Sequence, residues 1–207
     1  MTTKVSYLVC FLALLLCFAG PAVADPVTLF TDLGPPGDVY MSNYGTTVCG
    51  LGFGSYCKDA KSVFSIPANG QFNVSQIDLG VSWESGPRTV FAALWTEDGF
   101  LNPGEELGFW NNLFVDQVFG GCCKLITISG ISGVTLNGGQ RYLMIVGPVD
   151  PNNTTFAAWN MNNQTNWRQG NPNAFDVLGW QIPEPGTLLS LCTGLILSLG
   201  AMRRKLS

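Results

Sequence analysis

Turn residues interrupt the middle of this chain so often that few folds remain open to it. Between Asp25 and about Gln181, short apolar or alternating runs are separated by loops such as "GPPGD", "ESGPR", "NGGQ" and "GPVDPNN". Gly, Pro, Asn and Asp supply the backbone angles of tight turns. No stretch of this region carries a 3.6-residue apolar stripe over three turns, so the pattern predicts an all-β sandwich. The expected strands are Val27–Phe30, Ser62–Ile66, Phe72–Trp83, Thr89–Thr96, Leu125–Ser129, Gln140–Val146, Thr154–Asn160 and Phe175–Trp180.

Composition argues against several classes of function. The 207 residues include no histidine, which removes the commonest general base, the usual catalytic triad and the commonest metal ligand. Between Asp25 and Ile182 there are thirteen acidic and six basic side chains, a balance of about −7 (6 − 13), so the body has no basic footprint for nucleic acid. We therefore expect a non-enzymatic protein with no cofactor, no metal and no nucleic-acid partner.

The first residues read as an export signal. An apolar stretch from about Val5 to Ala19 follows one lysine, and a helix-breaking Gly-Pro pair then precedes "AVA". Small side chains at Ala22 and Ala24 are typical of a signal-peptidase cleavage site, so we expect residues 1–24 to be a signal helix that is removed before Asp25. An uncleaved anchor is the alternative, and it exports the body equally.

The last residues read as a membrane segment. Residues 187–202 are mostly apolar, and a helix of sixteen residues spans about 24 Å, short of the ~30 Å hydrocarbon core. The basic cluster Arg203, Arg204 and Lys205 follows directly and would stay cytoplasmic by the positive-inside rule. The sequence therefore predicts a single, marginal transmembrane helix with the body outside. A buried core helix is the alternative, and the terminal basic cluster disfavours it.

Pro183, Glu184 and Pro185, followed by the apolar stretch and the basic terminus, resemble the PEP-CTERM sorting signal of bacteria over about residues 182–207. The resemblance implies transient membrane retention, cleavage near this motif by a membrane enzyme of the exosortase type, and delivery to the cell surface or the exopolysaccharide matrix. The two prolines also keep the segment before the membrane extended, the form in which a protease binds a peptide backbone. The chain thus divides into a signal peptide (1–24), an extracellular body (25–181) and a sorting signal (182–207).

A looser resemblance concerns the body. The stretches "IDLGVSW", "FAALWTEDGFLNPGEELGFW", "GVTLNGGQRYLMIVGP" and "AAWNMNN" are similar to the extracellular domains of other proteins with this tail, over about residues 70–160. The likeness implies a jelly-roll-like sandwich, flanked here by the signal helix and the transmembrane helix. No catalytic residue is carried over with it.

Four cysteines remain in the exported part, namely Cys49, Cys57, Cys122 and Cys123. An even count in an oxidising compartment indicates disulfides, and four cysteines allow three pairings. Closure of the local loop between Cys49 and Cys57 is the simplest choice. It would leave the adjacent Cys122 and Cys123 either bonded to each other or free, and otherwise each of them reaches back to one of the earlier pair. The spacing does not suit a zinc site.

The polar loop "NMNNQTNWRQGNPN" is where the sequence predicts ligand contacts. Trp167 stands there beside the amide of Asn163 and the guanidinium of Arg168, groups that suit a sugar ring in an extracellular polysaccharide. The alternative, which is commoner for a loop aromatic, is that Trp167 folds back onto the sandwich. Two other tryptophans, Trp95 and Trp159, lie within strand patterns and are expected in the core.

The alternative function is an extracellular carbohydrate-active enzyme or carbohydrate-binding module on the same anchor. Glycoside hydrolysis needs only two facing carboxylates. The turn "EDGFLNPGEE" concentrates acidic side chains and could also hold calcium through Asp98, Asn102 and Glu105. We expect these residues to be solvated loop positions. The available carboxylates are Glu84, Glu97, Asp98, Glu105, Glu106 and Asp116.

Overall fold

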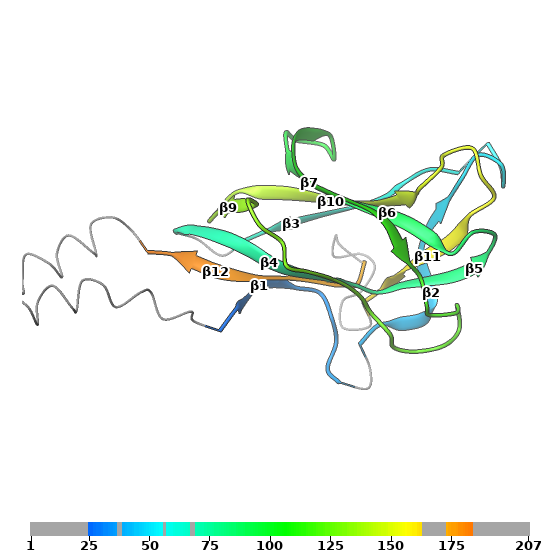
Figure 1. Cartoon of the computed structure of the whole chain (residues 1–207), viewed down its shortest axis with the longest axis horizontal. Helices are drawn as coiled ribbons and strands as arrows, with labels where there is room; N and C mark the ends of the chain where they lie inside the picture. The colour runs from blue at the N-terminus through cyan, green and yellow to red at the C-terminus, as the bar shows by residue number, and fades with distance from the viewer. Residues whose placement is uncertain (1–24, 37–38, 56, 67–68, 163–172, 184–207) are drawn as a thin grey trace, which may run out of the picture.

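The fold is a sandwich of antiparallel sheets, seen in a computed structural model that describes residues 25–36, 39–55, 57–66, 69–162 and 173–183. Two sheets face each other, and a smaller third sheet lies at the end of the sandwich away from Asp25 and Pro183 (Figure 1). The strands form three sheets, which we call the terminal sheet, the facing sheet and the end sheet. The terminal sheet has the order β1 (Val27–Thr31), β12 (Phe175–Ile182), β4 (Gln71–Leu79) and β8 (Ile126–Ser129), with β9 (Thr135–Asn137) also paired to β4; the facing sheet is β3 (Ala60–Ser65), β10 (Arg141–Pro148), β6 (Thr89–Glu97) and β7 (Pro103–Phe114); the end sheet is β2 (Met41–Cys49), β11 (Phe156–Met161) and β5 (Val81–Ser85).

The core lies between the terminal and facing sheets. Burial alternates residue by residue along β3 and β12, as expected when one face of each strand packs inward. Trp159 of β11 is fully buried, and its indole Nε1 donates a hydrogen bond to the Ala174 carbonyl at 3.0 Å. Its ring centroid is 5.5 Å from that of Phe175. This tryptophan therefore joins the end sheet to the terminal sheet, and its predicted core position is confirmed.

The all-β class predicted from the sequence is confirmed, and each expected strand overlaps an observed one. The described residues contain no helix, and hence none long and apolar enough to cross a membrane. The signal helix and the transmembrane helix expected at the two ends lie outside the described residues. The jelly-roll topology stays a prediction.

The expected strand Phe72–Trp83 is in fact two strands. β4 ends at Leu79, β5 begins at Val81, and Gly80 lies between them. A Cβ at position 80 would lie 2.8 Å from Cδ1 of the buried Tyr40 ring, so only glycine lets the backbone pass this ring. The chain crosses here from the terminal sheet to the end sheet.

Strands β2, β7 and β9 were not expected from the sequence. β2 and β7 are largely exposed strands of polar composition, and β9 has only three residues. The turn "EDGFLNPGEE" was predicted as loop throughout, which is wrong from Pro103 onward, where β7 begins. Edge strands such as β2 and β7 lack the regular apolar alternation by which strands are predicted from sequence.

We predict that Trp159→Ala destabilises the protein by about 3–5 kcal/mol, because it leaves a large cavity and removes the buried hydrogen bond from the indole to the Ala174 carbonyl. Urea unfolding of the full-length chain in mild detergent, followed by circular dichroism, measures the loss. Phe100→Ala is the control, since this side chain is 98% exposed. An equal effect of both substitutions would contradict the assignment of Trp159 to the core.

Candidate functional site

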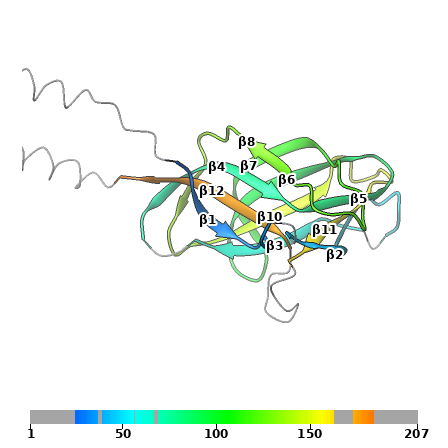
Figure 2. The same cartoon turned by 90° about the horizontal axis from the view of Figure 1, so that it is seen from below.

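The first and last described residues of the body lie at the same end of the sandwich. β1 and β12 are antiparallel neighbours, with Val27 opposite Gly179, and β12 ends opposite the start of β4, with Ile182 opposite Gln71. The first residues of β1 and the last of β12 therefore lie side by side (Figure 2). Pro183, the first residue of the sorting motif, is exposed and directly follows β12. The motif is thus presented with no spacer after the folded body.

Most residues expected to direct sorting fall outside the described residues. These are Glu184 and Pro185 of the motif, Ala22 and Ala24 of the cleavage site, and the topology signal Arg203, Arg204 and Lys205.

Cys49 and Cys57 form a disulfide with a Cα–Cα distance of 5.0 Å, the local pairing that the sequence favours. Both cysteines are buried, and the loop that they close carries Phe53, whose ring stacks on Phe156 at 4.2 Å between centroids. Cys122 and Cys123 are bonded to each other. The Cys49–Cys57 bond closes a local loop, and neither bond joins distant strands.

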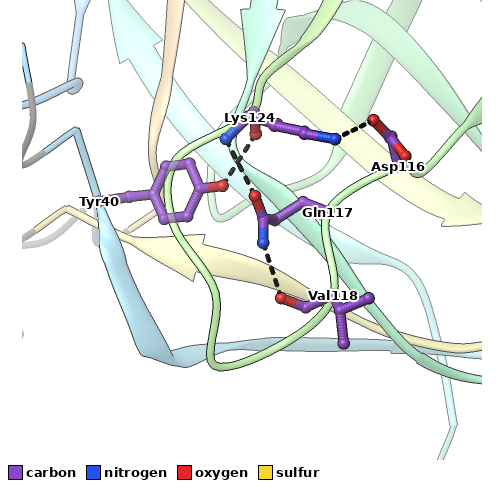
Figure 3. A network of polar contacts seen from close by, with 5 residues as sticks. All are labelled: Tyr40, Asp116, Gln117, Val118 and Lys124. Atoms are coloured by element: carbon purple, nitrogen blue, oxygen red, sulfur yellow. Dashed lines mark hydrogen bonds and ion pairs between the residues drawn. The ribbon is translucent and has the colours of Figure 1, made fainter.

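The loop that carries Cys122 and Cys123 is fixed by a polar network (Figure 3). The Lys124 amide donates to Gln117 Oε1 at 3.1 Å, and the Tyr40 hydroxyl donates to the Lys124 carbonyl at 2.8 Å. The Lys124 ammonium pairs with the Asp116 carboxylate, and this hydrogen bond and charge lower the pKa of Asp116. Burial raises the pKa of Tyr40 to about 12. Asp116, one of the candidate carboxylates, is thereby engaged in holding the loop.

The acidic turn between β6 and β7 is also organised by internal contacts. Glu97 Oε2 accepts from Arg141 Nε at 3.2 Å, Glu97 Oε1 accepts from the Leu101 amide at 3.1 Å, and the Glu97 side chain is only 2% exposed. The Asn102 side-chain amide donates to the Gly99 carbonyl at 3.1 Å. Asp98, Glu105 and Glu106 are exposed. In the described part of the chain, no three His, Cys, Asp or Glu side chains gather in a way that could hold a metal ion.

A carboxyl pair that the sequence gave no reason to single out lies on the terminal sheet. Asp78 of β4 and Asp176 of β12 face each other across the two strands. Asp78 is buried, and it accepts hydrogen bonds from Thr127 Oγ1 and, at 2.6 Å, from Gln76 Nε2. Burial, the negative charge of Asp78 and a hydrogen bond with its side chain raise the pKa of Asp176 to about 7.

The two carboxyl groups belong to directly opposite residues of paired strands, so their side chains lie close together. The negative charge of Asp78 favours the protonated form of Asp176. Among the described residues, the buried Oδ1 of Asp176 has no hydrogen-bond partner. The carboxylates of glycoside hydrolases instead stand ~5 Å or more apart with a sugar between them.

The residues expected to contact a ligand, Asn163, Trp167 and Arg168, lie outside the described residues. The residues that flank this segment are firmly placed. Asn162 Nδ2 donates to Asp32 Oδ1 at 3.2 Å, and Asn173 Oδ1 accepts from Thr46 Oγ1 at 2.7 Å. Burial raises the pKa of Asp32 to about 6, although the bond from Asn162 lowers it.

Trp95 was expected in the core, and this expectation is wrong. Its half-buried ring lies on the outer face of the facing sheet, because Leu94 and not Trp95 points into the core. It belongs to a separate apolar group with Val63, Phe91, Ala93, Leu143 and Ile145, and Phe109 stacks on Phe91 beside it. We call these seven residues the outer aromatic face.

Comparison with known families agrees with the reading of the C-terminus. Residues 181–205 match a family model described as the PEP-CTERM protein-sorting motif, so the resemblance noted from the sequence is confirmed. No curated protein and no solved structure matches the chain. The motif implies export, membrane-associated sorting and an exosortase as the processing partner.

We predict that Asp176→Asn stabilises the protein at neutral and alkaline pH. The folded-state pKa of about 7 lies above the unfolded value of ~3.9, so the folded state binds the proton more tightly. The bound proton stabilises the folded state fully below the unfolded-state pKa of ~3.9, and this stabilisation is lost as the pH rises through the folded-state pKa of about 7. Asparagine mimics the protonated form, so the gain in Tm should grow between pH 4 and 7 and reach ~5 °C at pH 8.

Thermal unfolding between pH 4 and 9 measures this gain. Asp116→Asn is the matched control, because its pKa is lowered by Lys124 and its removal should give no gain at pH 8. A gain for Asp176→Asn that is the same at pH 4 and at pH 8 would show that the pKa of Asp176 is not raised in the folded state.

Proposed function

We propose that this chain is an exported, non-enzymatic protein that acts at the cell surface or in the extracellular polysaccharide matrix. Its body is a jelly-roll-like sandwich, released from an N-terminal signal peptide and held transiently by a C-terminal helix. An exosortase then processes the chain near Pro183, Glu184 and Pro185. The matched sorting motif supports the export and the processing partner.

The observation that carries this proposal is the placement of the two ends of the body. The paired residues begin at Val27, two positions after the expected signal-peptidase cut, and they end at Ile182, one position before the sorting motif. A cut after Ala24 and a cut after Pro183 would therefore spare every described residue that is paired in a sheet, although the matched sorting model itself begins at Gln181, inside β12. The folded body is the part that such processing leaves behind.

The state of the carboxylates supports a binding or structural role. Glu97 is neutralised by Arg141, Asp116 is paired with Lys124, and Asp78 accepts hydrogen bonds from Thr127 and Gln76. Without histidine, an enzyme on this fold would depend on carboxylates. The alternative of a carbohydrate-active enzyme requires two free carboxylates on opposite sides of a sugar, and the exposed Asp98, Glu105 and Glu106 beside the turn between β6 and β7 are the candidates left for that role.

The location of the disulfides also supports an extracellular site of action. Cys49–Cys57 and Cys122–Cys123 are both formed in the structure, and disulfides persist in oxidising compartments. The low proportion of charged residues and the acidic body suit a protein that works among polysaccharides outside the cell.

We predict that the protein recovered from the cell surface begins at Asp25 and lacks the end of the chain. Replacement of Pro183, Glu184 and Pro185 together by alanine should block processing, because the extended recognition segment is lost. The unprocessed protein should then stay in the membrane fraction with Ser207 intact. Cell fractionation and mass spectrometry of both termini measure this outcome.

Asp150→Ala, in an exposed turn outside the sorting signal, serves as the control and should be processed normally. Wild-type protein on the cell surface with Ser207 intact would show a permanent anchor and would rule out cleavage.

A further inference from the structure

The outer aromatic face is built by register across three strands of the facing sheet, with β7 at its margin. Leu143 of β10 lies between Val63 of β3 and Trp95 of β6. One row further along the strands, Ile145 lies beside Ala93, and Ala93 is opposite Phe109 of β7. The alternate residues Tyr142, Met144 and Val146 point into the core. The sheet is therefore apolar on both faces, and only one face is covered by the terminal sheet.

The exposed part of this face consists mainly of aromatic rings. Ala93, Leu143 and Ile145 form a floor that is at most 7% exposed, whereas Phe109 is 49% exposed, and the rings of Phe91 and Trp95 are half-buried. Phe91 and Phe109 stack at 5.3 Å between centroids with an interplanar angle of 28°. Rings held in this way on a rigid sheet form a platform that loses little conformational freedom when a flat apolar surface stacks on it.

The size of the platform argues against a stable protein partner. Specific protein interfaces bury on the order of 800 Å² on each partner and involve about 20–30 residues a side. The outer aromatic face has seven residues, and three of them are already covered by their neighbours. The stacked rings of Phe91 and Phe109, with Trp95 further along β6, suit a few sugar units, whose C–H faces stack on aromatic side chains while their hydroxyls stay free to hydrogen bond.

Polar groups border the platform at the end where β6 turns into β7. In Figure 1 this turn rises above the facing sheet, on the side away from the terminal sheet. The Leu101 amide and Arg141 both bind Glu97, which fixes the turn against the strand ends. The Arg141 side chain remains 60% exposed and has N–H groups beyond those that bind Glu97. It can therefore donate hydrogen bonds to hydroxyls of a chain lying on the rings.

The charges around the platform are balanced. Lys61 stands in the row of Ile145 and Ala93, and its positive charge acts on Asp59 nearby. Arg141 is neutralised by Glu97, and Glu106 lies opposite Trp95. Two positive and three negative side chains give a balance of −1 (2 − 3) on a body whose own charge is about −7. An anionic polymer is repelled by such a surface, and a neutral one is not.

We propose that the outer aromatic face binds a neutral polysaccharide. Sugar rings stack on Phe91, Trp95 and Phe109, and Arg141 and Lys61 donate hydrogen bonds to their hydroxyls. The inference rests on the proposed function at the cell surface or in the matrix and gives it a ligand class and a site.

Affinity electrophoresis of the processed protein through gels containing laminarin, dextran or alginate tests the proposal. We expect at least one of the neutral polymers to retard the protein. In the accompanying binding titration, the affinity for that polymer should be unchanged between 50 and 500 mM NaCl, because binding a neutral polymer releases no counterions. Trp95→Ala and Phe109→Ala should each weaken that binding about tenfold, the size of effect expected when a stacking ring is lost. Because Phe109 is half-exposed, its variant folds even if Trp95→Ala does not.

Tyr44→Ala is the matched control, because Tyr44 is an aromatic side chain 65% exposed on β2, in the end sheet, and its variant should bind as the parent does. Neutral-polymer binding that survives both Trp95→Ala and Phe109→Ala would overturn the site. Salt-sensitive binding to alginate alone would overturn the ligand class. No binding to any polymer by protein that is still processed and displayed would overturn this inference and leave the sorting proposal standing. Self-association that Phe109→Ala abolishes in sedimentation would show that a second copy, and not a polysaccharide, covers the face.

Discussion

The pairing of β12 on both of its edges is the interaction on which the rest of this structure depends. β12 is the last strand of the body, yet it lies inside the terminal sheet between β1, the first strand, and β4. The sheet therefore closes only when the two ends of the body meet, a contact that spans almost the whole body in sequence. Such non-local pairing is costly in loop-closure entropy and forms late. During export the body thus reaches its final form only after residues 175–182 have crossed the membrane.

This closure also determines what the sorting enzyme meets. Because β1 and β12 are antiparallel neighbours, the segment before Asp25 and the segment after Pro183 adjoin the same end of the sandwich. The disulfide Cys49–Cys57 at the end of β2 and the loop with Cys122 and Cys123, which is bonded to β2 and β5, belong to the end sheet. The part of the body remote from the two ends is thereby reinforced covalently. The end near the sorting signal is held by hydrogen bonds and packing, with Ile182 paired up to the residue before the motif.

The sequence predicted the strands with a regular apolar pattern and missed those that contribute only a few side chains to the core, such as Val48 of β2, Leu107 of β7 and Leu136 of β9. β3, β6, β10 and β12 carry apolar or alternating patterns, and all four were expected within a few residues. β2 and β7 are exposed, so their side chains carry no such pattern. The same limit explains Trp95. Alternation shows that Trp95 and Leu94 point to opposite faces, but it does not tell which face is inside, and here both faces are apolar. The unbroken apolar run in β10 was the available signal, because a strand with one wet face would alternate. The contact between Asp78 and Asp176 depends on which strands pair, and no local pattern reports that.

The sequence and register of the edge strand β7 indicate which part of the facing sheet is open to other molecules. As an edge strand of twelve residues, β7 would offer a row of free backbone groups to another strand. Its pairing with β6 is interrupted by three register shifts, and it begins with Pro103 and carries Glu105 and Glu106. Bulges, proline and charges are the devices by which natural sheets block the addition of strands. In the described part of the chain, Phe109 of the outer aromatic face is half exposed, and Phe91 and Trp95 are partly exposed. A surface that resists pairing along its edge and leaves rings partly open on its face suits the sugar chain that we propose better than it suits a peptide strand.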